Sequence, residues 1–168
     1  MSGIIKATNL EVTTIKDKTN SNTAMTIDTS GNVSIKVAGA HARVDYGGPQ
    51  SYASISAGII AFDNILENIG NHYNTSTYKF TCPVDGLYQA SISLLTQNAT
   101  DQFGCDLYKA DVRIARNYQV YRALHATNFT LCSAGDTLHW YLSQNESVYT
   151  ATTGDPYTYA SYSLIYAT

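Results

Sequence analysis

Apolar and polar residues alternate in short runs along most of this chain, and a period of two is typical of β-strands. In the clearest run, Tyr88, Ala90, Ile92 and Leu94 alternate with polar residues. Similar runs return about every 8–12 residues between residues 54 and 168, and none has the period of an amphipathic helix. Many short strands at this spacing predict an all-β sandwich, barrel or jelly roll.

Residues 1–40 also alternate, but they contain no aromatic residue. The polar segment 28–32 includes Ser-Gly-Asn, which suits a turn with positive φ, so it should reverse the chain between two strands. The apolar positions of this arm are Leu10, Val12, Ile15, Met25, Ile27, Val33 and Ile35. Because two-stranded ribbons are marginally stable in water, we expect these positions to attach the arm to other copies or to a docking surface. A flexible tail is the alternative.

Residues 41–53 lie between these two regions. They contain Gly47-Gly48-Pro49 and are rich in small residues. We interpret it as a Gly/Ala-rich junction. The predicted organisation is therefore an N-terminal β arm (residues 1–40), a junction (residues 41–53) and a globular head (residues 54–168).

Composition narrows the classes of function. Charged residues make up 14% of the chain and the net charge is −3, which argues against a nucleic-acid surface with clustered Lys and Arg. We interpret Arg113, Arg116 and Arg122 as a solvated strand face. No apolar run is long enough to span a membrane, so we expect no membrane insertion. The 14 tyrosines are typical of strands and interfaces.

The N-terminal residues lack the basic and apolar segments of a secretory signal, so we expect synthesis and use without that export route. The three cysteines, Cys82, Cys105 and Cys132, are an odd number without a Cys-x-x-Cys pair. This pattern favours free, buried thiols from a reducing compartment over a disulfide framework.

Candidate chemistry is sparse. The four histidines, His41, His72, His125 and His139, have no metal-ligand spacing, and no Gly-x-Ser-x-Gly elbow accompanies them. Only three glutamates are available as catalytic acids. We therefore assign no catalytic residue and no cofactor. Calcium at Asp101, Asp106 and Asp111 is the weaker alternative to a structural role for these acids, because their spacing matches no calcium loop.

Residues 62–95 resemble the signature of the C1q domain of the C1q/tumour-necrosis-factor superfamily. The matching positions are Phe62, Asn68, Tyr73, Asn74, Phe80, Pro83, Gly86 and Tyr88. Farther on, "CDLYKAD", "LCSAGDTLHWYLS" with Gly135-Asp136, and the terminal "YASYSLIYAT" are similar to later family segments. The resemblance implies a C1q/TNF-like jelly-roll sandwich. Its fold-motif core is expected to be Phe62, Tyr73, Phe80, Pro83, Gly86, Tyr88, Trp140 and Tyr162.

Two positions depart from the family pattern: Tyr78 stands where Gly is usual, and Tyr162-Ser163-Leu164 replaces a Phe-Gly-Phe run. A collagen Gly-x-y stretch is also absent, which argues against a complement-type function. The resemblance further implies a tight homotrimer around a threefold axis.

The arm has a resemblance of its own. "ATNLEVTTIKDKTNSNTAMTIDTSGNVSIK" is similar to segments of tail-fibre and other virion proteins of tailed bacteriophages. Together the two resemblances imply a phage structural protein: a trimeric C1q-like knob or short fibre on the virion surface, synthesised in the host cytoplasm. Its arm would bind another virion protein of the capsid or tail.

We expect the capsid position, because about 40 extended residues at ~3.3 Å each are too short for a long tail-fibre shaft. The alternative is a receptor-binding fibre tip or adhesin that recognises a host-surface glycan or protein through Tyr-rich loops such as residues 149–159. A free bacterial C1q-like protein is a third hypothesis.

Overall fold

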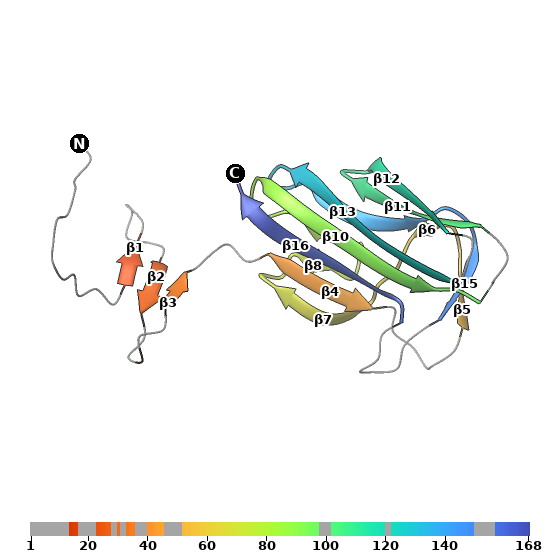
Figure 1. Ribbon diagram of the computed structural model, residues 1–168, viewed down its shortest axis with the longest axis horizontal. Coiled ribbons are helices and arrows are strands. Elements are labelled where there is room, and N and C mark those ends of the chain that lie inside the picture. Colours follow the sequence, from red (N-terminus) through yellow and green to blue (C-terminus); the bar gives the residue numbers. More distant parts are fainter. Residues whose placement is uncertain are drawn as a thin grey trace. The chain divides into compact units, whose positions relative to one another are not determined.

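The computed structural model describes residues 14–16, 23–27, 30, 33–35, 40–45, 52–97, 102–119, 122–149 and 157–168. The chain divides into two compact units, Met1–Ala38 and Gly39–Thr168 (Figure 1). All of the strand pairings are antiparallel, and the described residues contain no helix. The all-β prediction is therefore confirmed.

The first unit contains a three-stranded sheet of β1 (Thr14–Lys16), β2 (Thr23–Ile27) and β3 (Val33–Ile35). β2 and β3 form the hairpin predicted around residues 28–32, with Ile27 opposite Val33. Met25 lies opposite Ile15 on one side and Ile35 on the other, so three predicted attachment positions share one register row. Leu10 and Val12 lie outside the described residues.

The second unit, the head, is a sandwich of two main sheets. The five-stranded sheet has the order β13 (Ala123–Cys132), β10 (Gly86–Leu95), β16 (Tyr159–Ala167), β4 (His41–Asp45) and β7 (Asn64–Ile69). The six-stranded sheet has the order β12 (Val112–Gln119), β11 (Phe103–Lys109), β14 (Thr137–Leu142), β9 (Lys79–Thr81) and β8 (Tyr73–Asn74), with β6 (Gly58–Ile59) also paired to β14. A two-stranded ribbon of β5 (Tyr52–Ile55) and β15 (Glu146–Tyr149) completes the head.

The strands of the head begin at His41 and not at residue 54. β4 pairs with both β16 and β7 inside the five-stranded sheet, and β5 pairs with β15. Ala40, Ala42 and Val44 are buried in the core. Small side chains that suggest a linker in the sequence therefore occupy core positions in the head.

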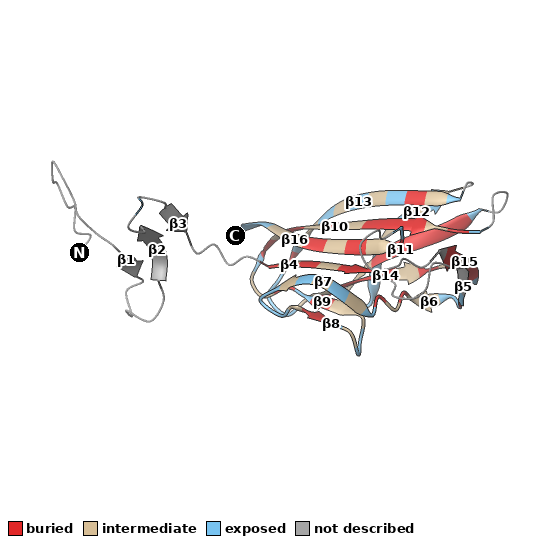
Figure 2. Ribbon diagram, turned by 90° about the horizontal axis from the view of Figure 1, so that it is seen from below, coloured by how far each residue is buried: buried red, intermediate tan, exposed pale blue. Residues whose placement is uncertain are grey.

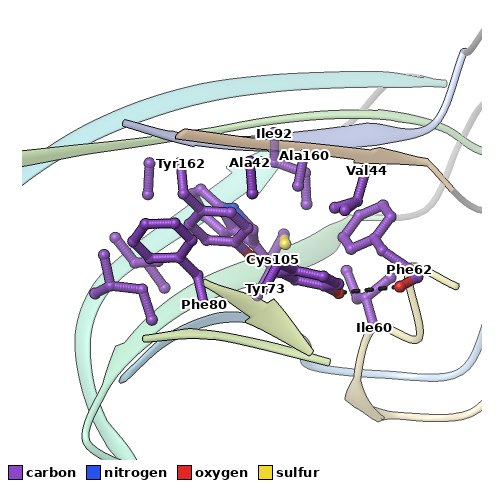
Figure 3. Close-up of a cluster of buried hydrophobic side chains, with 14 of the residues drawn as sticks. Ala42, Val44, Ile60, Phe62, Tyr73, Phe80, Ile92, Cys105, Ala160 and Tyr162 are labelled. Carbon is purple, nitrogen blue, oxygen red and sulfur yellow. Dashed lines mark hydrogen bonds between the residues drawn. The ribbon is translucent and has the colours of Figure 1, made fainter. Parts of the chain in front are cut away.

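Large rings fill the space between the sheets (Figure 3). Phe80 stacks on Tyr162 with ring centroids 5.3 Å apart and planes 9° apart, and Tyr73 stacks on Tyr162 at 5.9 Å. Tyr88 meets Phe80 edge to face at 6.1 Å. Offset and edge-to-face contacts are the preferred arrangements of aromatic rings, so these rings fix the spacing of the two sheets.

The hydroxyl groups of two core tyrosines find backbone partners, which offsets the cost of burying them. Tyr73 Oη donates to the carbonyl oxygen of Phe62 at 3.0 Å, and Tyr88 Oη donates to that of Val84 at 2.8 Å. Figure 2 shows the buried residues concentrated on the inner strands. The edge strands β7 and β12 contain no buried residue.

Candidate oligomerisation surface

The outer face of the five-stranded sheet carries an uncovered apolar patch where β10 begins and β13 and β16 end. Leu87 lies opposite Leu131 on β13 and opposite Tyr166 on β16, and Phe129 occupies the next outward position of β13. The exposed fractions are 60% for Phe129, 60% for Leu131 and 50% for Tyr166. We call these four residues the apolar patch. Clustered large apolar side chains that remain exposed in one copy mark an interaction surface.

A polar belt follows the patch on β10, β13 and β16 and continues onto the neighbouring strands β4 and β7. Ser91 Oγ and Thr127 Oγ1 lie 3.0 Å apart, and Gln89 Nε2 donates to Ser91 Oγ at 3.1 Å. His41 Nδ1 lies 2.7 Å from Ser163 Oγ, and its Nε2 lies 3.1 Å from Glu67 Oε2. Because these groups are paired within the chain, the belt can be covered by another copy with little loss of hydrogen bonding.

A hollow lies beyond the belt, toward the other end of the strands. Its volume is about 360 Å³. It is lined by Ser93, Leu94, Leu95, Ala123, His125, Tyr157 and Tyr159. Along β10 the outer face therefore presents, in this order, the apolar patch, a polar belt whose hydrogen bonds are made within the chain, and a largely apolar hollow.

The sequence contained a signal for the patch in β13. Leu124 and Cys132 are buried, but between them the core-facing positions include Asn128 and Thr130. The outward positions of the same segment are Phe129 and Leu131, so here the apolar residues face away from the core. Alternation alone assigns the more apolar side of a strand to the core, and it therefore misses a strand whose outer side is the interface.

The six aromatic residues of the predicted fold-motif core are all buried: Phe62, Tyr73, Phe80, Tyr88, Trp140 and Tyr162. Pro83 lies between β9 and β10 and is half-buried. Gly86 starts β10, and a Cβ there would collide with the carbonyl oxygen of Tyr166. The position requires glycine because β16 approaches its backbone closely, and not because of a turn conformation.

The other motif residues have local structural roles. Asn68 holds the backbone of Tyr73, since its Nδ2 donates to the Tyr73 carbonyl and its Oδ1 accepts from the Tyr73 N–H, both at 3.0 Å. Tyr78, which stands where the family pattern has Gly, has φ 58°. A non-glycine residue rarely adopts this left-handed conformation, which explains the usual glycine. Gly135 also has a positive φ, of 90°, in the turn before β14.

The acidic residues considered for calcium have other partners. Asp106 is buried and accepts from Arg116 Nη2 at 3.0 Å, with Arg113 Nη1 3.5 Å away. Asp111 pairs with Lys79. Asp101 lies outside the described residues. Within the described part of the chain, no three His, Cys, Asp or Glu residues form a group that could hold a metal ion.

His139 is the one strongly perturbed histidine among those described. It lies on β14 between Leu138 and Trp140, and the ring of Tyr108 stacks on it at 5.3 Å. Burial, with a further contribution from the Lys79 ammonium, lowers the pKa of His139 to about 4. This arrangement is that of a neutral packed histidine.

The loop predicted for receptor recognition, residues 149–159, is described only at Tyr149 and from Tyr157 onward. The receptor hypothesis therefore stays a prediction from the sequence. No helix in the described part of the chain has the length and apolar character needed to cross a membrane.

Comparison with known sequences gives a family. The family model described as "C1q domain" matches residues 48–166. Complement C1q tumor necrosis factor-related protein 5 of Rattus norvegicus is 37% identical over 62 residues, which are 37% of this chain and 25% of that protein. The Bacillus subtilis (strain 168) protein YqcC is 30% identical over 91 residues, which are 54% of this chain and 24% of that protein. The matches thus span about a quarter of the length of these two curated relatives.

Solved structures show the same fold at low sequence identity. Eiger TNF from S. frugiperda matches 77% of this chain and 94% of its own, with a TM-score of 0.63 and 10% identity. Murine APRIL matches 76% and 99%, with a TM-score of 0.59 and 10% identity. The globular domain of the zebrafish complement 1qA protein matches 77% and 99%, with a TM-score of 0.50 and 17% identity. The two-sheet sandwich, its motif residues and the family match over most of the head lead to one conclusion: this chain belongs to the C1q domain family, with a C1q/TNF-like jelly-roll head.

Proposed function

We propose that this protein is a structural component of a bacteriophage particle: a trimeric C1q-like knob that decorates the virion surface, with the capsid as the favoured position. C1q/TNF-family domains commonly form homotrimers and are typically non-enzymatic. The observation that carries the proposal is the apolar patch, because Phe129, Leu131 and Tyr166 remain exposed side by side on one face of the head.

The patch suits contact between copies of this chain. Aromatic and aliphatic residues at the centre of a surface, surrounded by polar groups, are the usual composition of a subunit interface. The polar belt beside the patch has its hydrogen bonds within the chain, so covering it leaves few groups unpaired. In this proposal the outer face of the five-stranded sheet packs against neighbouring heads around a threefold axis.

The arm supports the virion part of the proposal. Its sheet has strands of only three to five residues, and such a small sheet gains stability by pairing with other chains. Ile15, Met25 and Ile35 form one register row across this sheet. We propose that the arms of a trimer attach to a capsid or tail protein through these positions and their neighbours. The resemblance of residues 7–36 to phage fibre segments favours that partner.

A density map of the particle by electron cryomicroscopy tests the location directly. The proposal expects threefold knobs of the size of three heads on the capsid surface. Knobs at the tail tip would instead favour the receptor-binding alternative. A particle that contains the protein in neither place would contradict both.

Removal of residues 1–36 tests the arm. We expect the truncated head to remain folded, by circular dichroism, and trimeric, because its sheets belong to a separate compact unit. It should be absent from purified particles when it is the only copy supplied. Incorporation at the level of the full chain would contradict the role of the arm in attachment.

A further inference from the structure

Two cysteines from different sheets meet where the sheets end. Cys82 directly follows β9 of the six-stranded sheet, and Cys132 is the last residue of β13 in the five-stranded sheet. Cys82 N donates to the Asp136 carbonyl at 2.8 Å, and Gly135 N donates to the Cys82 carbonyl at 2.8 Å. The turn that follows Cys132 is therefore fastened to the backbone of Cys82.

The side chains of these cysteines also meet. Both thiols are free and buried, and each thiol shifts the pKa of the other, as expected for neighbouring groups. The two backbone hydrogen bonds of Cys82 with the turn after Cys132 bring the thiols to the same end of the sandwich, and a disulfide then requires Cβ atoms about 3.5–4.5 Å apart. The third cysteine, Cys105, lies in β11. Its charge interactions are with Asp106 and Tyr162.

We propose that Cys82 and Cys132 form a disulfide bond between the two sheets when the protein, made with reduced thiols, meets a small-molecule disulfide such as oxidised glutathione. For a particle component, release from a reducing cytoplasm would provide that change of environment. The bond would turn a head that folds with free thiols into one whose two sheets are covalently joined.

The surroundings of the pair set the order of the reaction. Cys132 is 5% exposed and precedes the exposed residues Ser133 and Ala134, whereas Cys82 is fully buried. Burial raises the pKa of both thiols, but the hydrogen bond from Cys82 and the nearby Lys109 ammonium act to lower that of Cys132. Cys132 is therefore the thiol that reacts first when this end of the sandwich opens.

The exchange balances in two steps. The Cys132 thiol loses its proton, and its sulfur attacks one sulfur of oxidised glutathione. A mixed disulfide forms and one glutathione leaves as a thiolate. The Cys82 thiol then loses its proton and attacks the Cys132 sulfur, which releases the second glutathione. The two cysteines are oxidised, one glutathione disulfide is reduced, and the two thiolates take up the two protons.

The full-length protein tests this proposal. Native protein incubated with oxidised glutathione is alkylated, digested and mapped by mass spectrometry. We expect one intramolecular disulfide joining Cys82 and Cys132, a loss of two hydrogen masses, and alkylation of Cys105 alone. Closing a chain loop of this length should raise the thermal unfolding midpoint by roughly 10 °C, and dithiothreitol should reverse the shift.

Three single variants separate the roles of the cysteines. Cys82→Ala should accumulate one glutathione on Cys132, because the second attack is lost. Cys132→Ala should remain unmodified at Cys82 over the same time, and Cys105→Ala should form the same disulfide as the unmodified protein. Three results would overturn the proposal. The first is a disulfide that includes Cys105, and the second is a disulfide between copies. The third is three free thiols after native protein has been incubated with oxidised glutathione at a temperature that opens the sandwich.

Discussion

The two sheets of the head differ on their outer faces. On the six-stranded sheet, Tyr108 stacks on His139 at 5.3 Å and lies 5.2 Å from Tyr141, so the chain's own rings cover this face over β11 and β14. On the five-stranded sheet, Phe129 and Leu131 are each 60% exposed, so the described part of the chain leaves them largely uncovered. The first face is covered over β11 and β14 in one copy, although Val112 and Tyr118 on its edge strand β12 stay exposed. The second has the composition of a surface that another copy completes.

Charged groups show the same difference. On the six-stranded sheet the buried Asp106 carboxylate is paired with Arg116 and Arg113. Pairing of this kind is what makes a buried carboxylate tolerable in a single chain. At the apolar patch, by contrast, the Lys109 ammonium donates to the backbone carbonyl of Leu131, at 3.1 Å, and the side chains of Phe129 and Leu131 stay exposed. The buried carboxylate of the six-stranded sheet is therefore paired within the chain, whereas the apolar patch of the five-stranded sheet stays exposed.

The largest effect expected from this comparison is a pH dependence that arises from His139. An unfolded histidine is protonated below pH 6.5, whereas folded His139 stays neutral down to about pH 4 because burial and Lys79 lower its pKa. Between these values the unfolded state binds more protons, so stability falls as the pH falls. We expect a loss of up to roughly 3 kcal/mol in the free energy of unfolding from pH 6.5 to pH 4, measured by urea denaturation.

A matched pair of histidines controls this experiment. His139→Asn should reduce the slope of stability against pH in that window. His125→Asn makes the same substitution at an exposed histidine on the other sheet and serves as the matched variant. Equal slopes for His139→Asn and the unmodified protein would show that Tyr108 does not keep His139 out of solvent.

A smaller effect separates one ring on each outer face. Tyr108→Ala should lower the free energy of unfolding by about 1–2 kcal/mol, because Tyr108 packs on His139 and Tyr141. Phe129→Ala should change it by only about 0.5 kcal/mol, because its ring has little cover within one copy. Both are measured on a Leu131→Arg background so that association does not contribute. A loss at Phe129 as large as that at Tyr108 would break the comparison.

The strands and the core of the head were predictable from the sequence because burial on one side enforces alternation. Tyr88, Ile92 and Leu94 alternate in the sequence and are buried on β10. The family motif placed Phe62, Tyr73 and Phe80, whose rings fill a narrow space that tolerates few substitutes.

The start of the head and its outer face were harder to predict. Ala40 and Ala42 suggest a linker, because the sequence alone does not distinguish a small side chain in a loop from one that is buried in the core. Phe129 and Leu131 have the alternation of a strand, but nothing in a period of two says which side faces the core. The pairing of Cys82 with Cys132 joins residues distant in the sequence, so only the register of β13 and the turn after it bring them together.

The central claim is that the apolar patch closes a trimer, and light scattering coupled to size-exclusion chromatography tests it most directly. The unmodified chain, of 18.3 kDa, should elute with three times that mass. Leu131→Arg should elute as a folded monomer, while Thr81→Arg, an exposed position on the six-stranded sheet, should stay trimeric. The account would be contradicted if the unmodified chain eluted as a monomer at micromolar concentration. It would also be contradicted if Leu131→Arg formed a trimer as stable to dilution as that of the unmodified protein.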